Sequence, residues 1–397
     1  MKKIDILITL GVIVLLFSGC IRENKTSSEI NNTVVIKINP TEINSLDDFI
    51  DKVESIRFLP LETNNENTID YVQKLWLTDR SMFIMTRSTN EVHKYRHDGT
   101  FQFKIEKKGK GKEELSSVFD FCPAPNDGLF ILGYRNYYEF DSHGKMLRIT
   151  PIIEPFESYG IRKFYIVNDT FSVFASSSTG CSERAVENNY IWVVNKLSNE
   201  NRFCMYRYTK GIVDEVFHQS NDIILVNPYF GLDTIYSWQD NMVKPLYCID
   251  FGDYKTSVDK IPADYYDGWK AVEFLNTTSG CLYINSAFMS DDWLMFKFMF
   301  KADDYQVLYH KKTANMLVGN YADNLHPHIL YCTVPVAVFQ NEFIYSIPAY
   351  LIVKKLESNS LDFKFLSEAR HNEIIDQLKK VKETDNPVLM FVKMKPE

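Results

Sequence analysis

Two histidines that flank a proline, His326 and His328, have the clearest potential for metal chemistry. In an extended segment, residues i and i+2 point to the same side, so both imidazoles could face one ion. Two ligands are too few for a stable site, and the sequence assigns no third. We therefore predict no metal site, and we retain His326 and His328 as candidate ligand-binding residues in a polar loop.

A second candidate is the segment Asp264–Trp269, which reads DYYDGW. Sugar-binding surfaces use aromatic faces, against which CH groups stack, together with polar groups that hydrogen-bond hydroxyls. The alternative is a short helix whose rings are buried between neighbouring structural units. We take Tyr265, Tyr266 and Trp269 as candidate binding residues.

Other patterns exclude the common catalytic chemistries. The acidic pairs Asp291-Asp292 and Asp303-Asp304 flank a predicted strand, where adjacent residues point to opposite faces, so they fit hairpin ends better than a catalytic carboxylate pair. The run Gly109–Lys112 lacks the spacing of a nucleotide-binding loop. Neither HExxH nor GxSxG occurs. We predict no catalytic residue and no cofactor.

The N-terminus has the features of a bacterial secretion signal. Two lysines precede an apolar run, Ile6–Phe17, which is shorter than the roughly 20 helical residues that span a bilayer. Ser18-Gly19-Cys20 then resembles a lipobox, in which small residues admit the protease and the thiol takes the lipid. We predict a signal peptide at 1–19 and a lipidated tether at 20–33, with an ordinary signal peptide or a short anchor as alternatives.

Composition favours a large all-β protein with no affinity for nucleic acid. Hydrophobic residues make up 45% of the chain and aromatic residues 14%, which favours strands. The net charge of −8 gives no basic surface for nucleic acid. The six cysteines after Cys20 are scattered without a CxxC pair, so we expect buried free thiols.

From about residue 68 the chain repeats a pattern of short strands separated by turns. The first unit has predicted strands at Val72–Leu77, Ser81–Thr86, Glu91–Tyr95 and Phe101–Ile105. A similar unit begins about 46 residues later at Val118, a spacing typical of propeller blades. Both units place a glycine, Gly99 or Gly144, in the last hairpin turn, where a positive φ is expected.

Later units are longer and less regular, and a helix follows them. We place the units at 159–208, 212–251, 270–319 and 326–356. Short helices are predicted near 45–52, capped by Ser45, and at 367–383, where apolar residues recur on one face. The segment Val388–Lys393 then reads as a final strand.

Two segments in one unit, Phe230–Tyr236 (FGLDTIY) and Lys244–Gly252 (KPLYCIDFG), resemble the blade signature of the Bacteroidetes six-bladed β-propeller lipoproteins. The strand Ile56–Thr63 and the ending Asp385–Phe391 are similar to the first and last segments of that family. The loop at Gly109–Leu115 departs from the family pattern.

The resemblance implies an all-β, six-bladed β-propeller over residues 34–397, with a short C-terminal helix and ring closure by the terminal strands. It implies a location in the cell envelope and assigns no catalytic residue. Pairing of the terminal strands would remove the exposed edges that invite aggregation.

We predict a lipid-anchored envelope protein that acts as a non-enzymatic binding or scaffold module for a glycan, a peptide or an envelope protein. The alternative is a glycan- or peptide-directed lyase or hydrolase at the central funnel, which rests on fold analogy. The membrane would be contacted through the lipid on Cys20, at the periplasmic side or the cell surface. The residues after Cys20 lack the acidic cluster associated with surface export in Bacteroidetes lipoproteins, so the resemblance favours the periplasmic side.

Overall fold

The computed structural model divides the chain into two units, Met1–Val34 and Val35–Glu397, and the second is described here. The structure describes residues 33–106, 109, 111, 114–152, 161–176, 191–198, 201–205, 216–220, 223–227, 233–256, 277, 280–301, 303–320, 334–361, 363 and 365–396.

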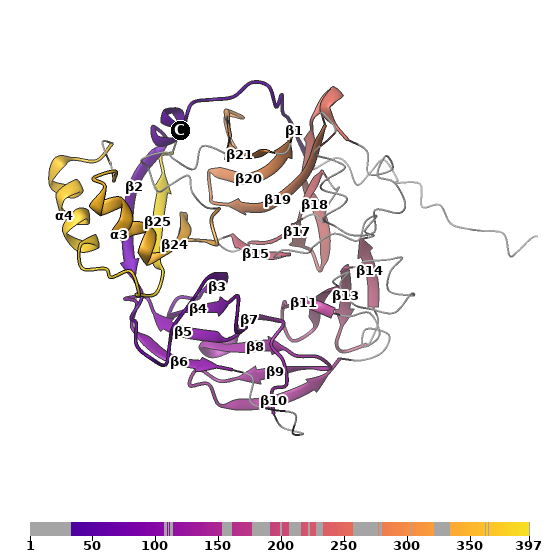
Figure 1. Cartoon of the computed structure of the whole chain (residues 1–397). Coiled ribbons are helices and arrows are strands. Elements are labelled where there is room, and N and C mark those ends of the chain that lie inside the picture. The colour runs from indigo at the N-terminus through magenta and orange to yellow at the C-terminus, as the bar shows by residue number, and fades with distance from the viewer. Residues whose placement is uncertain are drawn as a thin grey trace, which may run out of the picture. The chain divides into compact units, whose positions relative to one another are not determined.

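Four-stranded antiparallel sheets are the repeating element of this unit (Figure 1). The first contains β3 (Val72–Leu77), β4 (Ser81–Thr86), β5 (Val92–Arg96) and β6 (Phe101–Ile105). The second contains β7 (Asp120–Ala124), β8 (Gly128–Leu132), β9 (Asn136–Phe140) and β10 (Met146–Pro151). The third contains β11 (Ile161–Ile166), β12 (Phe171–Ser176), β13 (Ile191–Asn195) and β14 (Asn201–Met205). Another contains β19 (Cys281–Met289), β20 (Trp293–Phe300), β21 (Asp303–His310) and β22 (Met316–Asn320).

The remaining described strands form one sheet in the order β1-β18-β17-β16-β15-β23-β24-β25-β2. Its first half contains β1 (Val34–Lys37), β15 (Phe217–Ser220), β16 (Ile223–Val226), β17 (Thr234–Gln239) and β18 (Met242–Asp250). Its second half contains β2 (Val53–Pro60), β23 (Ala337–Phe339), β24 (Glu342–Ile347) and β25 (Val388–Met394). A single parallel residue pair, Ser220 with Val338, joins β15 to β23.

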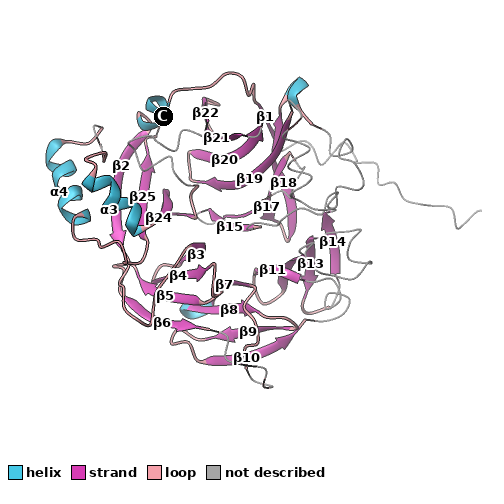
Figure 2. Cartoon of the chain, viewed as in Figure 1, coloured by secondary structure: helices cyan, strands magenta, loops and turns pink. Residues whose placement is uncertain are grey.

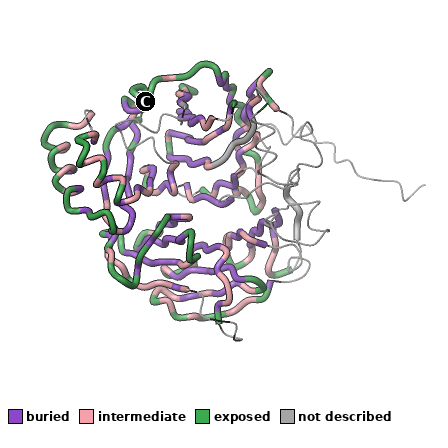
Figure 3. Tube along the Cα trace, viewed as in Figure 1, coloured by how far each residue is buried: buried purple, intermediate pink, exposed green. Residues whose placement is uncertain are grey.

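Strands in the interior of the sheets are buried on both faces, because neighbouring sheets pack face to face. All six residues of β4, SMFIMT, are buried, and the buried tube in Figure 3 follows such strands. Phe83 on β4 packs against Phe121 on β7, with ring centroids 6.5 Å apart. The hydrophobic core therefore lies between successive sheets rather than in one central cluster.

Helices are few and lie mainly beside the last sheet (Figure 2). Within the described residues they are α1 (Leu46–Ile50), α3 (Ala349–Glu357), α4 (Glu368–Leu378) and the 3-10 turns η2 (Pro125–Asp127) and η4 (Gly252–Tyr254). Ser45 and Asp48 form the predicted capping box of α1. The expected strand-rich unit at 326–356 is wrong in its last part, because α3 occupies it. Ala349 and Ile352 of that helix, three positions apart, are buried against the core. This helical spacing is hard to see in the sequence, because the neighbouring residues are apolar as well.

The N-terminal strand β2 pairs antiparallel with the C-terminal strand β25, from Val53 opposite Met394 to Pro60 opposite Val388. Asn386, which precedes β25, is buried and ties this end of the chain to the loop after β2. Its Nδ2 donates to the carbonyl of Glu62 at 2.8 Å, and its Oδ1 accepts from the amide of Ile69 at 2.7 Å.

The predicted all-β fold is confirmed, and its repeated antiparallel four-stranded sheets are propeller-like. The predicted bounds of β3, β4 and β6 match those observed. Gly99 and Gly144 have φ of 85° and 79°, as the hairpin pattern predicts. A Cβ at Gly99 would lie 2.5 Å from the carbonyl oxygen of Pro60, so only glycine fits that turn.

Candidate functional site

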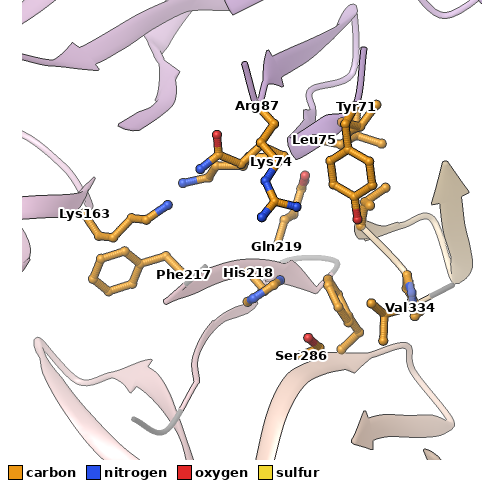
Figure 4. A pocket seen from close by; sticks show the side chains of 15 residues that line it. Tyr71, Lys74, Leu75, Arg87, Lys163, Phe217, His218, Gln219, Ser286 and Val334 are labelled. Atoms are coloured by element: carbon orange, nitrogen blue, oxygen red, sulfur yellow. The ribbon is translucent and has the colours of Figure 1, made fainter. Parts of the chain in front are cut away.

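A cavity of about 370 Å³ lies where the first strands of several sheets meet (Figure 4). Its described lining comes from β3 and the residue before it, the residue after β4, β11, β15, β19 and the segment before β23. These segments are far apart in sequence and belong to different sheets. We call this space the central cavity. It is lined by Tyr71, Val72, Gln73, Lys74, Leu75, Arg87, Lys163, Phe217, His218, Gln219, Ser286, Phe288, Val334, Pro335 and Val336.

Two lysines reach the central cavity from strands that are otherwise mostly buried. Lys74 on β3 is buried, and its Nζ lies 2.7 Å from Oδ1 of Asp120 on β7. Oδ2 of Asp120 accepts a hydrogen bond of 3.0 Å from the amide of Phe164, so the carboxylate is well satisfied. Lys163 on β11 is 6% exposed, and Figure 4 shows its amine directed toward the same space as that of Lys74.

A third cation, Arg87, follows β4 at the rim of the central cavity and is exposed. Its amide donates to the carbonyl of Tyr71 at 3.1 Å, which holds the two residues together. The guanidinium carbon lies 5.6 Å from the centroid of the Tyr71 ring, within cation–π range. In Figure 4 the guanidinium projects into the space between Lys163 and Tyr71.

His218 on β15 lines the opposite side of the central cavity and is 8% exposed. Its ring meets the ring of Phe288 edge-on, with centroids 4.3 Å apart. Ser286, also in the lining, has φ of 51° at a bulge of β19, a conformation that is uncommon for residues other than glycine. Such backbone strain is concentrated at functional sites.

Gln73 presents a polar atom that the described part of the chain leaves unsatisfied. Its Oε1 is buried and accepts no hydrogen bond from any described residue. Leaving a buried acceptor without a donor costs about 1–3 kcal/mol, so a hydroxyl or amide donor from a ligand would be favourable there.

The floor of the central cavity is formed by Gln219. The central cavity is lined by residues 71–75, around the first part of β3. A second cavity of about 460 Å³ is lined by residues 77–79, at the other end of that strand. Gln219 lines both spaces. It therefore separates two cavities that open at opposite ends of β3 (Val72–Leu77).

The composition of the lining favours an anionic ligand. Lys74, Arg87 and Lys163 supply three fixed positive charges, and none of the described lining residues carries a carboxylate. Asp120, which is not among the described lining residues, pairs with Lys74. Ion pairs and charge-assisted hydrogen bonds to cationic groups are strongest in partly buried sites of this kind.

Other chemistries find little support among the described residues. No group of three or more His, Cys, Asp or Glu side chains in that part of the chain is placed to hold a metal ion. Cys122 and Cys281 are free thiols as predicted, and burial raises the pKa of each to about 12. Because the thiolate is the reactive form, neither is a nucleophile at neutral pH.

All of the site residues predicted from the sequence lie outside the described residues. They are Cys20, Tyr265, Tyr266, Trp269, His326 and His328. The acidic pairs occupy the hairpin positions expected of them, since Asp291-Asp292 precede β20 and Asp303 begins β21. No helix in the described ranges is long and apolar enough to cross a membrane.

The residues of the central cavity were missed, although a signal for two of them exists. Lys74 in VQKLWL and Lys163 in IRKFYI are charged residues inside apolar strands. Each is the kind of residue that an inner strand directs toward a central space. Arg87, His218 and Gln219 lie in segments with no such pattern.

Solved structures similar to this chain include a protein from Bacteroides fragilis NCTC 9343 described as exported. It is 15% identical, the match covers 92% of this chain and 100% of that one, and the TM-score is 0.71. A gluconolactonase from Xanthomonas campestris is 10% identical over 91% of this chain and 97% of that one, with a TM-score of 0.42. An extracellular domain described for a hybrid two-component system of B. thetaiotaomicron is 9% identical over 66% and 29%, with a TM-score of 0.35.

Comparison with curated proteins finds no match. A family model described as a domain of unknown function, DUF4934, matches residues 33–393. That range takes in every described strand except the last residue of β25, Met394, and the whole described lining of the central cavity. The chain therefore belongs to the DUF4934 family of domains of unknown function.

Proposed function

We propose that this chain is a lipid-anchored envelope β-propeller that binds an anionic ligand, carried by a glycan or a peptide, in its central cavity without transforming it. The observation that carries the proposal is the convergence of Lys74, Arg87 and Lys163 on one cavity whose described lining lacks carboxylates. A guanidinium and two ammonium groups in a partly dry space favour carboxylate or sulfate oxygens over neutral groups.

The proposal includes six blades within a single domain at residues 34–397. Its support is that the nine-stranded sheet is joined at its middle by one residue pair, so its halves count as two blades beside the four separate sheets. The pairing of β2 with β25 supports ring closure, because it places the first and last strands of one blade side by side. Limited proteolysis that released a stable fragment from within 34–397 would contradict the single domain.

The anchor and the location are part of the proposal. Its support is the lipobox-like segment ending at Cys20, with 20–33 as the tether. The similar B. fragilis protein is described as exported. Metabolic labelling with an alkyne fatty acid tests the anchor: the wild-type chain should carry the label, and Cys20→Ala should abolish it. Protease shaving of intact cells separates the periplasmic side, which we favour, from the cell surface.

Ligand binding is tested with the full mature lipoprotein in detergent by isothermal titration calorimetry. D-galacturonate supplies a carboxylate, and D-galactose is its neutral counterpart. We expect D-galacturonate to bind and D-galactose to bind at least about tenfold more weakly. Tenfold corresponds to about 1.4 kcal/mol of binding free energy, the order of one charge-assisted contact. Arg87→Ala should weaken binding of the acid. Arg96→Ala is the matched control, because Arg96 is exposed at the opposite end of the same sheet.

Equal affinity for galacturonate and galactose would overturn the proposal. So would the failure of galacturonate, N-acetylglutamate and sulfate alike to bind. Thermal unfolding of Arg87→Ala shows whether the variant is folded. Because Arg87 is exposed, we expect its unfolding temperature to match that of the wild type.

One observation favours an enzyme as the second candidate. His218 and Tyr71 line the same cavity as Arg87, which brings possible proton acceptors near a cation (Figure 4). In a uronate lyase, a base removes the proton next to the carboxylate and the glycosidic bond breaks as a ring double bond forms. Incubation with polygalacturonate tests this through the ultraviolet absorbance of the unsaturated product. An absorbance increase that His218→Gln abolishes would replace the non-enzymatic proposal.

A further inference from the structure

Three arginine–aromatic pairs lie at the ends of the first three sheets, beside the central cavity. Besides Arg87 with Tyr71, the guanidinium of Arg162 lies 3.8 Å from the centroid of the Phe119 ring. The guanidinium of Arg135 lies 5.7 Å from the centroid of the Tyr134 ring. We call these residues the arginine–aromatic rim: Tyr71, Arg87, Phe119, Tyr134, Arg135 and Arg162.

Three members of the rim lie at the starts of strands in successive sheets. Tyr71 precedes β3, Phe119 precedes β7 and Arg162 is the second residue of β11. Contacts between β7 and β11 keep one register, because the amide of Phe164 bonds to Asp120 and the amide of Ile166 bonds to Sγ of Cys122. The two strands therefore run in the same direction, and their first residues lie at the same end.

The rim is continuous with the central cavity. Tyr71 and Arg87 belong to both. Phe119 precedes Asp120, whose carboxylate lies 2.7 Å from Nζ of Lys74 in the lining, and Arg162 precedes Lys163 of the lining on β11. The rings of Phe119 and Tyr134 meet edge-on with centroids 6.4 Å apart, which joins the second and third pairs into one cluster. The rim thus leads from the cavity over the ends of the second and third sheets.

The chemistry of the rim matches a chain of acidic sugar units. Tyr71 is 47% exposed and Tyr134 is 63% exposed, so each leaves ring surface for the CH face of a sugar. A guanidinium held against a ring loses little entropy on binding and presents its N–H fork to a carboxylate or sulfate. Asp70, next to Tyr71, places a negative charge at this site, and its Oδ2 accepts from the amide of Ser88 at 3.2 Å.

We propose that the rim and the central cavity together bind an acidic polysaccharide, with one acidic sugar in the cavity and further units along Tyr71, Arg87, Phe119, Tyr134, Arg135 and Arg162. The inference rests on the proposed anion-binding function and names its ligand class. Carboxylated and sulfated polysaccharides share this chemistry: each sugar ring has hydroxyls and carries an anionic group. An acidic peptide lacks the rigid apolar faces that the exposed rings would stack against.

The test measures affinity against chain length with the full mature lipoprotein in detergent. The probes are galacturonate oligomers of increasing length, dextran sulfate as the sulfated arm, neutral dextran and poly-glutamate as the peptide arm. We expect the affinity for oligogalacturonate to rise at least about tenfold from monomer to tetramer, since the longer chain adds charge-assisted contacts along the rim. Raising the salt concentration should reduce this gain. Comparing dextran sulfate with oligogalacturonate shows whether sulfate or carboxylate is preferred.

Variants separate the rim from the cavity. Arg162→Ala should lower affinity for the tetramer about tenfold and leave monomer affinity unchanged, whereas Arg162→Lys, which keeps the charge without the planar fork, should fall between. Tyr134→Ala should weaken the oligogalacturonate complex and leave any poly-glutamate binding unchanged. Arg96→Ala, at the far end of the first sheet, is the matched control and should change neither. Thermal unfolding of each variant verifies folding.

Several outcomes would overturn this inference. They are affinity that does not depend on oligomer length, rim variants that bind the tetramer as the wild type does, and poly-glutamate that binds as tightly as oligogalacturonate of equal length. If galacturonate monomer still binds and depends on Arg87 in those cases, the anion-binding function stands and only the polysaccharide is excluded. If no anionic probe binds, both proposals fail.

Discussion

The side chain of Gln219 pairs with the backbone of Leu77 through two hydrogen bonds. The amide of Leu77 donates to Oε1 at 3.0 Å, and Nε2 donates to the carbonyl of Leu77 at 2.8 Å. The two residues are 142 positions apart and belong to β15 and β3. This carboxamide therefore acts like a short piece of strand that links two sheets, and it closes the floor of the central cavity.

Replacement of Gln219 should destabilise the fold and open the floor. Gln219→Ala leaves the amide and the carbonyl of Leu77 without their partner, at an expected cost of about 1–3 kcal/mol. Gln219→Glu keeps an acceptor for the amide but places an oxygen against the carbonyl, so it should also be destabilising. The urea midpoint of unfolding measures both. Unchanged midpoints would show that the pair contributes nothing to stability.

The ion pair between Lys74 and Asp120 should be strongly coupled, because both side chains are buried. Lys74→Met leaves the Asp120 carboxylate without its cation and should lower stability by about 3–5 kcal/mol. Lys74→Met combined with Asp120→Leu removes both charges and should cost less than the sum of the single changes. A double-mutant cycle on urea unfolding measures the coupling. Additive effects would contradict it.

Removal of the Asn386 side chain should loosen the junction between the two ends of the described chain. Asn386→Leu leaves the amide of Ile69 without its acceptor in a buried place, at an expected cost of about 1–3 kcal/mol. It also removes one of two donors to the carbonyl of Glu62, the other being Nδ2 of Asn67 at 3.0 Å. The neighbouring Asp385→Asn is the control, because asparagine can still accept from the amide of Lys382. Differential scanning calorimetry measures both, and equal unfolding temperatures would be contrary to expectation.

His93 should make stability depend on pH. Burial lowers the pKa of His93 from its ordinary value of 6.5, although Glu91 opposes this shift. Between the lowered pKa and 6.5 the unfolded state binds more protons than the folded state, so stability rises with pH and is lost as pH falls through that window. His93→Phe should flatten this dependence, and His143→Gln, at an exposed site, should leave it unchanged. Urea unfolding measured from about pH 5 to about pH 7 checks this expectation.

Neutralising Asp70 should strengthen anion binding at the rim. Partial burial raises the pKa of Asp70, but hydrogen bonds from Ser88 and from backbone amides outweigh it and lower the pKa overall. The carboxylate is therefore ionised at neutral pH, where it repels an acidic ligand. Asp70→Asn should tighten oligogalacturonate binding about threefold, a plausible gain for one screened charge. Asp98→Asn, in the turn at the far end of the sheet, is the calorimetric control, and weaker binding by Asp70→Asn would refute the expectation.

Local patterns determined much of the fold. The bounds of β3 and β20 follow from apolar runs between turn residues, and the cap of α1 follows from Ser45 and Asp48. These features depend on contacts within a few residues, which the sequence displays directly. The helix α3 was missed because its apolar residues, AYLIV, have the composition of a strand.

The candidate site could not be found in the same way. Lys74 and Lys163 each stand out as a charged residue in an apolar strand, but they are 89 positions apart, and the sequence does not show that they share a cavity. They share a cavity only because β3 and β11 both direct a face toward the space between sheets. The pairing of Gln219 with Leu77 likewise has no local signature.

By itself, the sequence determined an all-β chain of repeated strands and hairpins, because alternation, turn glycines and caps act over short distances. Tertiary structure alone decided that Lys74, Arg87 and Lys163 meet in one cavity. It also set the register in which β2 pairs with β25, where the sequence resemblance implied only that the terminal strands pair. Such contacts depend on how whole sheets pack, which is a property of the assembled core rather than of any one segment.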